Sequence, residues 1–115
     1  MRLTELDPNW LEIIDERTVR TDGSMETAQG IAFLCPKCFV ENGNSAVGTH
    51  QVWCWFRHKG VPDEYSPKPG RWTPQGTGFE DLTFIPGDPP MPSSVQITSG
   101  CMWHGHVQNG EVSLS

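Results

Sequence analysis

The hydrophobic positions of this chain fall into short runs between turn-forming residues, a pattern that predicts strands rather than long helices. The strongest run is residues 50–56, in which apolar side chains occupy both faces, as in a central strand. Residues 31–34 form a second apolar run, typical of a buried strand, which leads directly into Cys35. Weaker signals predict a turn and a strand over 79–85 and a short strand over 94–98.

The end of the chain carries the clearest local signal, a hairpin with the two-residue turn Asn109-Gly110. This turn pairs 108 with 111, 107 with 112, and 105 with 114. Val107, Val112 and Leu114 then share one face of the hairpin. The opposite face holds polar side chains, namely His104, His106, Gln108, Glu111 and Ser113.

The first thirty residues predict short elements. A helix is expected to begin at residues 6–11, with Asp7 as its cap and Pro8 in the first helical position. Residues 13–20 favour a strand that ends before the turn Asp22-Gly23, and residues 24–30 favour a short helix capped by Ser24. Residues 57–78 and 86–92 are rich in Pro and Gly and predict irregular loops.

The length of 115 residues predicts one domain, residues 1–115, with an N-terminal helix and strand segment at 1–30 and a long loop at 57–78. We expect an α+β, mostly β fold, in which a small antiparallel sheet includes the strands near 31–35, 50–56 and 104–114. Only 36% of the residues are hydrophobic, and the chain has 12 Gly and 10 Pro. A core of this size is thin, so a covalent or metal cross-link would stabilise it.

The net charge of −6 favours a soluble protein, or one with a basic protein partner, over one that binds nucleic acid. The sequence has no run of about 18 apolar residues that would predict a membrane helix. The first residues lack the apolar stretch of an export signal, so a cytoplasmic location is expected. In that compartment cysteines bind metal or do chemistry more often than they form disulfides.

Two half-sites with metal-ligand spacing predict a structural zinc ion. Cys35 and Cys38 form a C-x₂-C turn, and Cys101 and His104 repeat the spacing with an imidazole. Together they make a Cys₃His set, which suits a closed tetrahedral Zn²⁺ site like that of a zinc ribbon. Because 62 residues separate Cys38 from Cys101, the ion would join an N-terminal knuckle to the C-terminal hairpin.

The identity of the ligands is less fixed than the presence of a metal. His106 lies on the same hairpin face as His104, and it can replace His104 or donate a hydrogen bond to a ligand. Cys54 and His50 share one face of their strand and are the other alternative ligands. Cys54 sits in an apolar run, which favours a small buried hydrophobe. His58, between Arg57 and Lys59, is expected in solvent.

Several strings of the sequence resemble one family: residues 30–38 with the CPKC motif, 48–50, 55–56, 71–72, 76–83, and 100–105 with the CMWHG motif. The chain is similar in these strings to small proteins of unknown function found largely in bacteriophages and prophages. The resemblance covers most of the chain from residue 30 onward, and the proline-rich stretch 87–92 departs from it. It implies Cys35, Cys38, Cys101 and His104 as metal ligands and a bacterial host cytoplasm as the location.

The function that these features favour is a zinc-stabilised protein-interaction module whose partner is a host or phage protein, for example a host factor or a defence protein. Trp72, in the long loop, is the expected partner contact, because aromatic residues in loops can be binding anchors. The same tryptophan can equally fill a thin core. No catalytic residue is predicted in this interpretation, and the sequence leaves the oligomeric state open.

Two alternatives have other chemistry. A metal-dependent hydrolase would hold zinc around Cys35, Cys101, His104 and His106, with Glu111 or Asp81 as general base. A nucleic-acid-binding zinc ribbon would use aromatic side chains to stack on bases, but the acidic charge and the lack of a basic stripe disfavour it.

Overall fold

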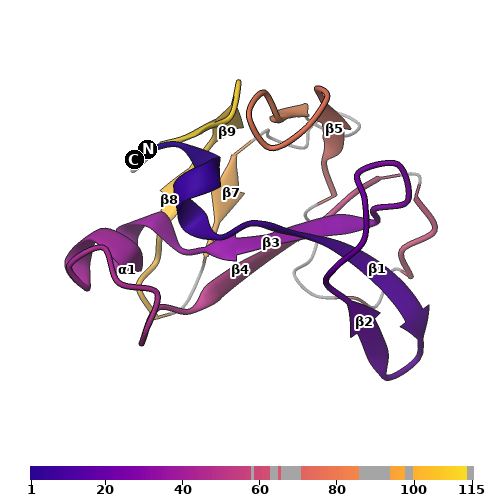
Figure 1. Ribbon diagram of the computed structural model, residues 1–115, viewed down its shortest axis with the longest axis horizontal. Coiled ribbons are helices and arrows are strands. Elements are labelled where there is room, and N and C mark those ends of the chain that lie inside the picture. Colours follow the sequence, from indigo (N-terminus) through magenta and orange to yellow (C-terminus); the bar gives the residue numbers. More distant parts are fainter. Residues whose placement is uncertain (58, 63–64, 66–70, 86–93, 98–99, 114–115) are drawn as a thin grey trace.

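The computed structural model describes residues 1–57, 59–62, 65, 71–85, 94–97 and 100–113 (Figure 1). A four-stranded antiparallel sheet forms its centre, with the strand order β2-β1-β3-β4. The bounds of these strands are β1 Asn9–Asp15, β2 Thr18–Arg20, β3 Gly30–Leu34 and β4 Gln51–Trp55. A 3-10 helix, η1 Leu3–Leu6, precedes the sheet, and one short helix, α1 Pro36–Glu41, follows β3.

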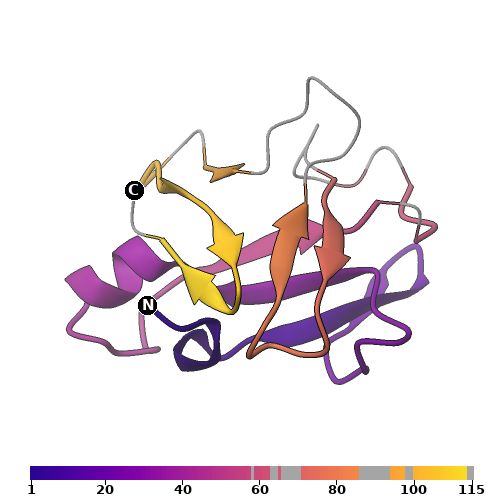
Figure 2. The ribbon, with the colours of Figure 1, turned by 90° about the horizontal axis from the view of Figure 1, so that it is seen from above.

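Three two-stranded antiparallel sheets complete the described part of the chain. They pair β5 Thr73–Gln75 with β6 Thr83–Ile85, β7 Val95–Gln96 with β8 His104–Gly105, and β9 Val107–Gln108 with β10 Glu111–Val112. Figures 1 and 2 show these small sheets gathered on one side of the four-stranded sheet. The mostly β fold with a small antiparallel sheet is therefore as the sequence predicts.

The core has two parts, one on each face of the four-stranded sheet. Strand β3 is buried along its whole length, so its alternate side chains enter both parts. Ile31 and Phe33 pack with the small sheets, whereas Ala32 packs with Trp55 on the opposite face. Gly30 permits a close approach of β4, because a Cβ there would lie 2.7 Å from the carbonyl oxygen of Cys54. This packing fixes the end of β3, where Cys35 follows.

The predicted helices near the start of the chain are wrong. The helical turn lies earlier, at η1, and ends at Asp7, whose φ of 48° is left-handed. Trp10 and Leu11 then bury on opposite faces of the sheet, and this alternation requires a strand. Residues 13–20 contain most of a hairpin of β1 and β2 rather than one strand, and residues 24–29 form turns before β3.

The predicted C-terminal hairpin is confirmed, including its register. Gln108 pairs with Glu111 and Val107 with Val112, while Asn109 and Gly110 have φ values of 54° and 74°. The sequence predicts the hairpin in the main antiparallel sheet, but it forms a separate two-stranded sheet. It hydrogen bonds instead to the first residues, where the Leu3 N–H donates to the Gly110 carbonyl at 2.8 Å. The predicted place of Leu114 lies outside the described residues.

The long loop at 57–78 is less irregular than predicted, because its last part forms β5 and pairs with β6. Residues 79–82 form turns before β6, and β7 occupies part of the predicted strand at 94–98. His58 and residues 87–92 lie outside the described residues.

Trp72 is a core residue, which contradicts its predicted role as an exposed partner contact. Its side chain is only 4% exposed and stacks on Phe84 with ring centroids 5.5 Å apart. Its backbone also bridges to Phe56 at the end of β4. The thin core thus uses this tryptophan as filling, the other role that its position allows.

Within the described residues, none of the helices has the length and apolar character needed to cross a membrane.

Candidate metal centre

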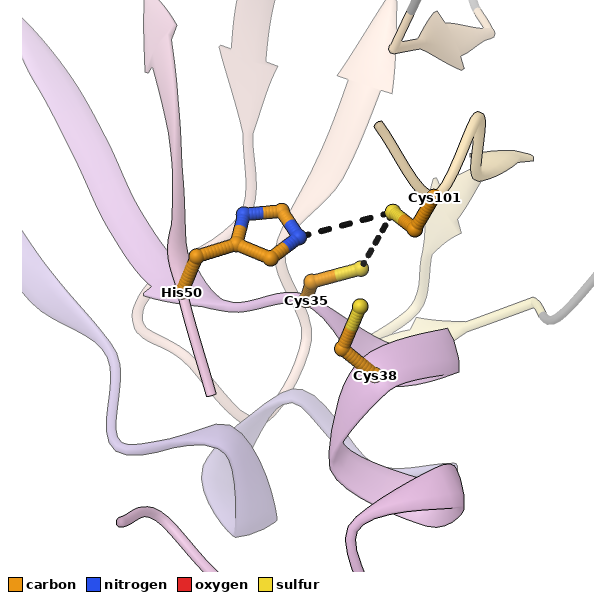
Figure 3. Close-up of side chains that lie close together, drawn as sticks. All are labelled: Cys35, Cys38, His50 and Cys101. Carbon is orange, nitrogen blue, oxygen red and sulfur yellow. Dashed lines mark hydrogen bonds between the residues drawn. The ribbon is translucent and has the colours of Figure 1, made fainter. Parts of the chain in front are cut away.

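Four side chains from three separate segments converge at one end of the four-stranded sheet (Figure 3). They are Cys35, Cys38, His50 and Cys101, and their sulfur and ring nitrogen atoms all lie within 4.8 Å of one another. Cys35 is buried, Cys38 and Cys101 are half-buried, and His50 is exposed. The group therefore lies at the surface, with Cys35 as its inner member.

The first arm of the site is the junction of β3 and α1. Cys35 is the residue before the helix, and Pro36 takes the first helical position, which its fixed φ favours. The carbonyl of Cys35 accepts a hydrogen bond from the Phe39 N–H at 2.9 Å. Cys38 then lies one turn along α1, so its thiol is on the same side as that of Cys35. The C-x₂-C spacing thus forms the first turn of a helix.

His50, the second arm, directly precedes β4. The Cys35 N–H donates to the carbonyl of His50 at 2.9 Å, which fixes the two residues side by side. The Nε2 of His50 lies 3.4 Å from the sulfur of Cys101, and Nδ1 lies 3.3 Å from the Gln51 carbonyl. With its proton on Nε2, His50 donates to the Cys101 sulfur, and with the proton on Nδ1 it donates to the Gln51 carbonyl and leaves the Nε2 lone pair for a metal. This is the usual arrangement of a metal-bound histidine.

Cys101, the third arm, lies in a tight turn before β8. Gly100 and Met102 on either side of it have left-handed φ values of 67° and 56°. The turn is closed by the Ile97 N–H, which donates to the Trp103 carbonyl at 2.8 Å. Lys37, between the two cysteines of the first arm, donates from Nζ to the carbonyl of Cys101 at 2.7 Å. This contact ties the first and third arms together.

The distances fit a tetrahedral ion. Bonds of about 2.3 Å to sulfur and about 2.0–2.1 Å to nitrogen place two sulfurs roughly 3.8 Å apart, and a sulfur and a nitrogen roughly 3.6 Å apart. The sulfurs of Cys35 and Cys101 are 3.6 Å apart, and the Cys101 sulfur is 3.4 Å from the His50 nitrogen. Disulfide sulfurs would lie only about 2 Å apart, and the four cysteines are free thiols. These two distances, with all four ligand atoms within 4.8 Å of one another, fit a tetrahedral metal site.

Protonation of the sulfurs depends on their place in the group. Burial raises the pKa of Cys35 to about 12, although a hydrogen bond from the Cys38 backbone N–H acts to lower it. Desolvation also raises the pKa of Cys38. Desolvation acts in the same direction at Cys101, but hydrogen bonds from the Trp103 N–H, His50 and the other two thiols bring its pKa to about 7. A divalent ion favours the thiolate form at all three sulfurs and so displaces their protons.

His104, predicted as the fourth ligand, does not belong to this group, and His50 takes that place. The reason lies in the neighbouring residue. Trp103 is buried and packs edge-on against Phe33, with the ring centroids 6.1 Å apart. Its ring N–H donates to the Ser113 carbonyl at 3.0 Å. Since successive side chains of a strand alternate, His104 lies on the opposite side and is exposed. Its backbone pairs with Gln96 of β7.

The other alternative ligands also lie outside the group. Cys54 is fully buried in the core of the sheet, where desolvation raises the pKa of its thiol. His106 is exposed, and its ring centroid is 6.3 Å from that of His104. The structure does not therefore bring Cys35, Cys101, His104 and His106 to one point, as the hydrolase alternative requires.

The two residues considered as general bases are engaged elsewhere. The carboxylate of Glu111 lies 3.4 Å from the amino group of Met1. Asp81 accepts the backbone N–H groups of Thr77 and Gly78 at 2.8 and 3.0 Å, which closes the turn before β6. Both carboxylates thus have structural contacts, and neither belongs to the metal group.

A signal for His50 exists in the sequence, but only once the strand register is known. The β3–β4 ladder pairs Ile31 with Cys54 and Leu34 with Gln51. The next pair in this antiparallel register is Cys35 with His50. A histidine opposite the first cysteine of a C-x₂-C turn is therefore the feature that identifies the fourth ligand.

Comparison with known proteins adds no relative: no protein-family model, curated protein or solved structure matches the chain. The interpretation of the site accordingly depends on its own geometry and ligand chemistry.

Proposed function

We propose that this chain is a zinc-stabilised protein-interaction module, with Zn²⁺ held by Cys35, Cys38, His50 and Cys101. The observation that carries the proposal is the convergence of three sulfurs and one correctly oriented imidazole nitrogen within 4.8 Å. Sulfur and imidazole ligands select zinc over the hard cations Ca²⁺ and Mg²⁺. Four protein ligands complete a tetrahedral shell and leave no position for a reactive water, which favours a structural role over catalysis.

The place of the site in the fold supports a structural role. The ion would connect the β3–α1 junction, the start of β4 and the turn before β8. Cys35 and Cys101 are 66 residues apart in sequence, so the cross-link closes a long loop. Such closure removes many conformations from the unfolded chain. A metal bound in this way would stabilise the packing of the small sheets on the four-stranded sheet.

Exposed apolar side chains around the site support an interaction role. Among the described residues, the large hydrophobic side chains that are exposed are Ile14, Val40, Val47 and Met102. Val40, Val47 and Met102 each lie within three residues of a ligand, and we call them the apolar rim. Met102 is 62% exposed and Val47 84% exposed. Exposed apolar residues that flank a site in the sequence are candidates for contact with a protein partner.

The partner would be a protein with a basic surface, because the chain has a net charge of −6. The same charge disfavours the phosphate backbone of nucleic acid. From the resemblance to phage proteins we propose a host or phage protein as this partner, in the cytoplasm of a bacterial host.

The test of the zinc site is native mass spectrometry of the chain purified without added metal. We expect one zinc ion per chain, which is lost in the variant Cys101→Ser and retained in the matched control Cys54→Ser. A folded protein without metal, or equal zinc in the two variants, would exclude the proposed centre.

The test of the interaction role uses affinity capture from a bacterial host with rim variants. Met102→Asn keeps a residue that tolerates left-handed φ, and Val47→Ser alters an exposed loop position, so neither disturbs the fold. We expect both to lose a partner that the control Ile14→Ser retains. Retention of every captured protein by the rim variants would remove the rim from the proposal.

A further inference from the structure

We infer that the metal centre is also a redox switch, in which a hydroperoxide converts Cys35 and Cys101 to a disulfide and releases the zinc ion. This inference rests on the proposed zinc site. It goes beyond it by assigning unequal roles to the three cysteines: Cys101 as the first sulfur oxidised, Cys35 as the sulfur that resolves it, and Cys38 as a ligand only.

The unequal exposure of the sulfurs supports the first assignment. Cys35 is fully buried, whereas Cys38 and Cys101 are half-buried, and of these two Cys101 lies in a turn beside the exposed His50 (Figure 3). A small oxidant therefore reaches the Cys101 sulfur before the Cys35 sulfur. Oxidation of cysteine follows exposure and thiolate character, and zinc keeps its sulfur ligands as thiolates.

Contact between sulfurs supports the second assignment. The sulfurs of Cys35 and Cys101 are in direct contact at 3.6 Å. The Cys38 sulfur also lies within 4.8 Å of the Cys101 sulfur, from the first turn of α1, where the Asn42 N–H donates to the Cys38 carbonyl at 2.9 Å. Cys54 is outside the group and buried in the sheet core. We assign the attack on an oxidised Cys101 to Cys35, because its sulfur is in contact with that of Cys101, and the experiment below distinguishes it from Cys38.

The chemistry balances in two steps. The Cys101 thiolate attacks one oxygen of hydrogen peroxide, the O–O bond breaks, and the products are a sulfenic acid and hydroxide. The Cys35 thiolate then attacks the Cys101 sulfur, the S–O bond breaks, and a disulfide and a second hydroxide form. Two protons from solvent convert the hydroxides to water. The two thiolates are oxidised by two electrons, the peroxide is reduced, and Zn²⁺, left with only Cys38 and His50, dissociates.

The disulfide would join the same two chain segments as the zinc ion. The β3–α1 junction and the turn before β8 therefore stay connected while Cys38 and His50 become free. The apolar rim includes Met102, directly after Cys101, and Val47, three residues before His50. Loss of the ion changes the support of both residues, so oxidation would change partner binding without unfolding the chain.

The experiment treats zinc-loaded Cys54→Ser protein with hydrogen peroxide and follows zinc release with a colorimetric chelator. Trypsin cleaves after Lys37, so Cys35 and Cys38 fall in different peptides, 21–37 and 38–57, and Cys101 falls in 72–115. The Cys54 substitution leaves a single cysteine in peptide 38–57. We expect release of the single zinc ion together with a disulfide between peptides 21–37 and 72–115, both reversed by dithiothreitol and added zinc.

Other outcomes overturn the inference. Zinc retained in excess peroxide, a disulfide that contains Cys38, or sulfinic acid without a disulfide would each contradict the assigned roles. If the protein carries no zinc before oxidation, the proposed zinc site is excluded. The pairing of the tryptic peptides then tests only whether Cys35 and Cys101 form a disulfide. Cys38→Ser is the second variant: in its reduced form peroxide should still join Cys35 to Cys101, and a product that joins Cys54 to Cys101 instead would contradict the role of Cys35.

Discussion

The backbone N–H of Cys35 donates to the carbonyl of His50 at 2.9 Å, so the pair directly beyond the β3–β4 ladder consists of two proposed metal ligands. The sheet itself therefore sets the distance between one sulfur and the imidazole. Only Cys101 must be brought from a remote part of the chain. Three of the four ligands are thus placed by the β3–β4 ladder and the first turn of α1, and the fourth, Cys101, depends on the packing of the small sheets.

Removal of the metal is expected to unfold the domain or leave it without fixed tertiary packing. Structural zinc contributes about 10–16 kcal/mol in small zinc peptides, which is comparable to the total stability of about 5–15 kcal/mol of a domain. Chelation, or Cys35→Ser, should therefore abolish the near-ultraviolet circular dichroism of the buried tryptophans. Cys54→Ser should leave that signal in place. Unchanged spectra after complete zinc removal would mean that the core is stable alone.

His50→Ala is expected to weaken zinc binding by more than about 100-fold, the upper limit for loss of a contact outside the ligand shell. His104→Ala should leave the affinity unchanged, because that side chain is exposed and outside the group. Competition with a chelator of known affinity measures both. The visible spectrum of the Co²⁺-substituted protein gives a second readout, since loss of a nitrogen ligand changes its bands. The reverse order of effects would restore His104 as ligand.

Lys37→Met is expected to weaken zinc binding by roughly tenfold, because Nζ no longer donates to the Cys101 carbonyl. Lys37→Arg retains the charge and a donor and should recover most of the affinity. Lys59→Met is the matched control, at an exposed position outside the metal group. If Lys37→Met and Lys59→Met have equal affinities, the contact of Lys37 has no part in metal binding.

The residues of the first arm show how far sequence could predict the site. Cys35 and Cys38 are neighbours through one helical turn, so their spacing alone identifies them. The partner of that arm depends on strand register, which local spacing does not contain, and His50 was therefore only an alternative. Spacing also favoured His104, but the burial of Trp103 decides which side of β8 is exposed. A ligand set divided among distant segments requires the tertiary structure.

The same contrast applies to the fold. Asn109-Gly110 determines its hairpin locally, because both residues accept left-handed φ. Asp7 and Pro8 are equally local helix signals, yet β1 follows them. The burial of Trp10 and Leu11 on opposite faces of the sheet stabilises the strand more than a cap stabilises a short helix. Local signals succeed where the turn itself is the structure and fail where tertiary packing competes.

Asp81 is expected to make stability fall in acid. Hydrogen bonds from Thr77, first from its backbone N–H, lower the pKa of this carboxyl in the folded state. Its contribution is therefore complete above the unfolded pKa and is lost as the pH falls through the lower, folded pKa. Urea unfolding of Asp81→Asn should show a smaller loss of stability over that range than the wild type. Glu16→Gln, at an exposed turn, is the control for the loss of one negative charge, and identical pH profiles for the wild type and Asp81→Asn would contradict the role of Asp81.

Gly110→Ala is expected to be more destabilising than Gly43→Ala, and the comparison isolates one close contact. Both glycines have left-handed φ, 74° and 69°, so the conformational penalty of about 1–2 kcal/mol is common to both variants. A Cβ at Gly43 meets open space, whereas one at Gly110 would collide with the backbone carbonyl of Glu80. That carbonyl belongs to the turn before β6, so relief of the clash must move the hairpin away from β6. We expect Gly110→Ala to lose roughly 3 kcal/mol or more in thermal or urea unfolding, and equal losses in the two variants would show that the hairpin does not need this approach.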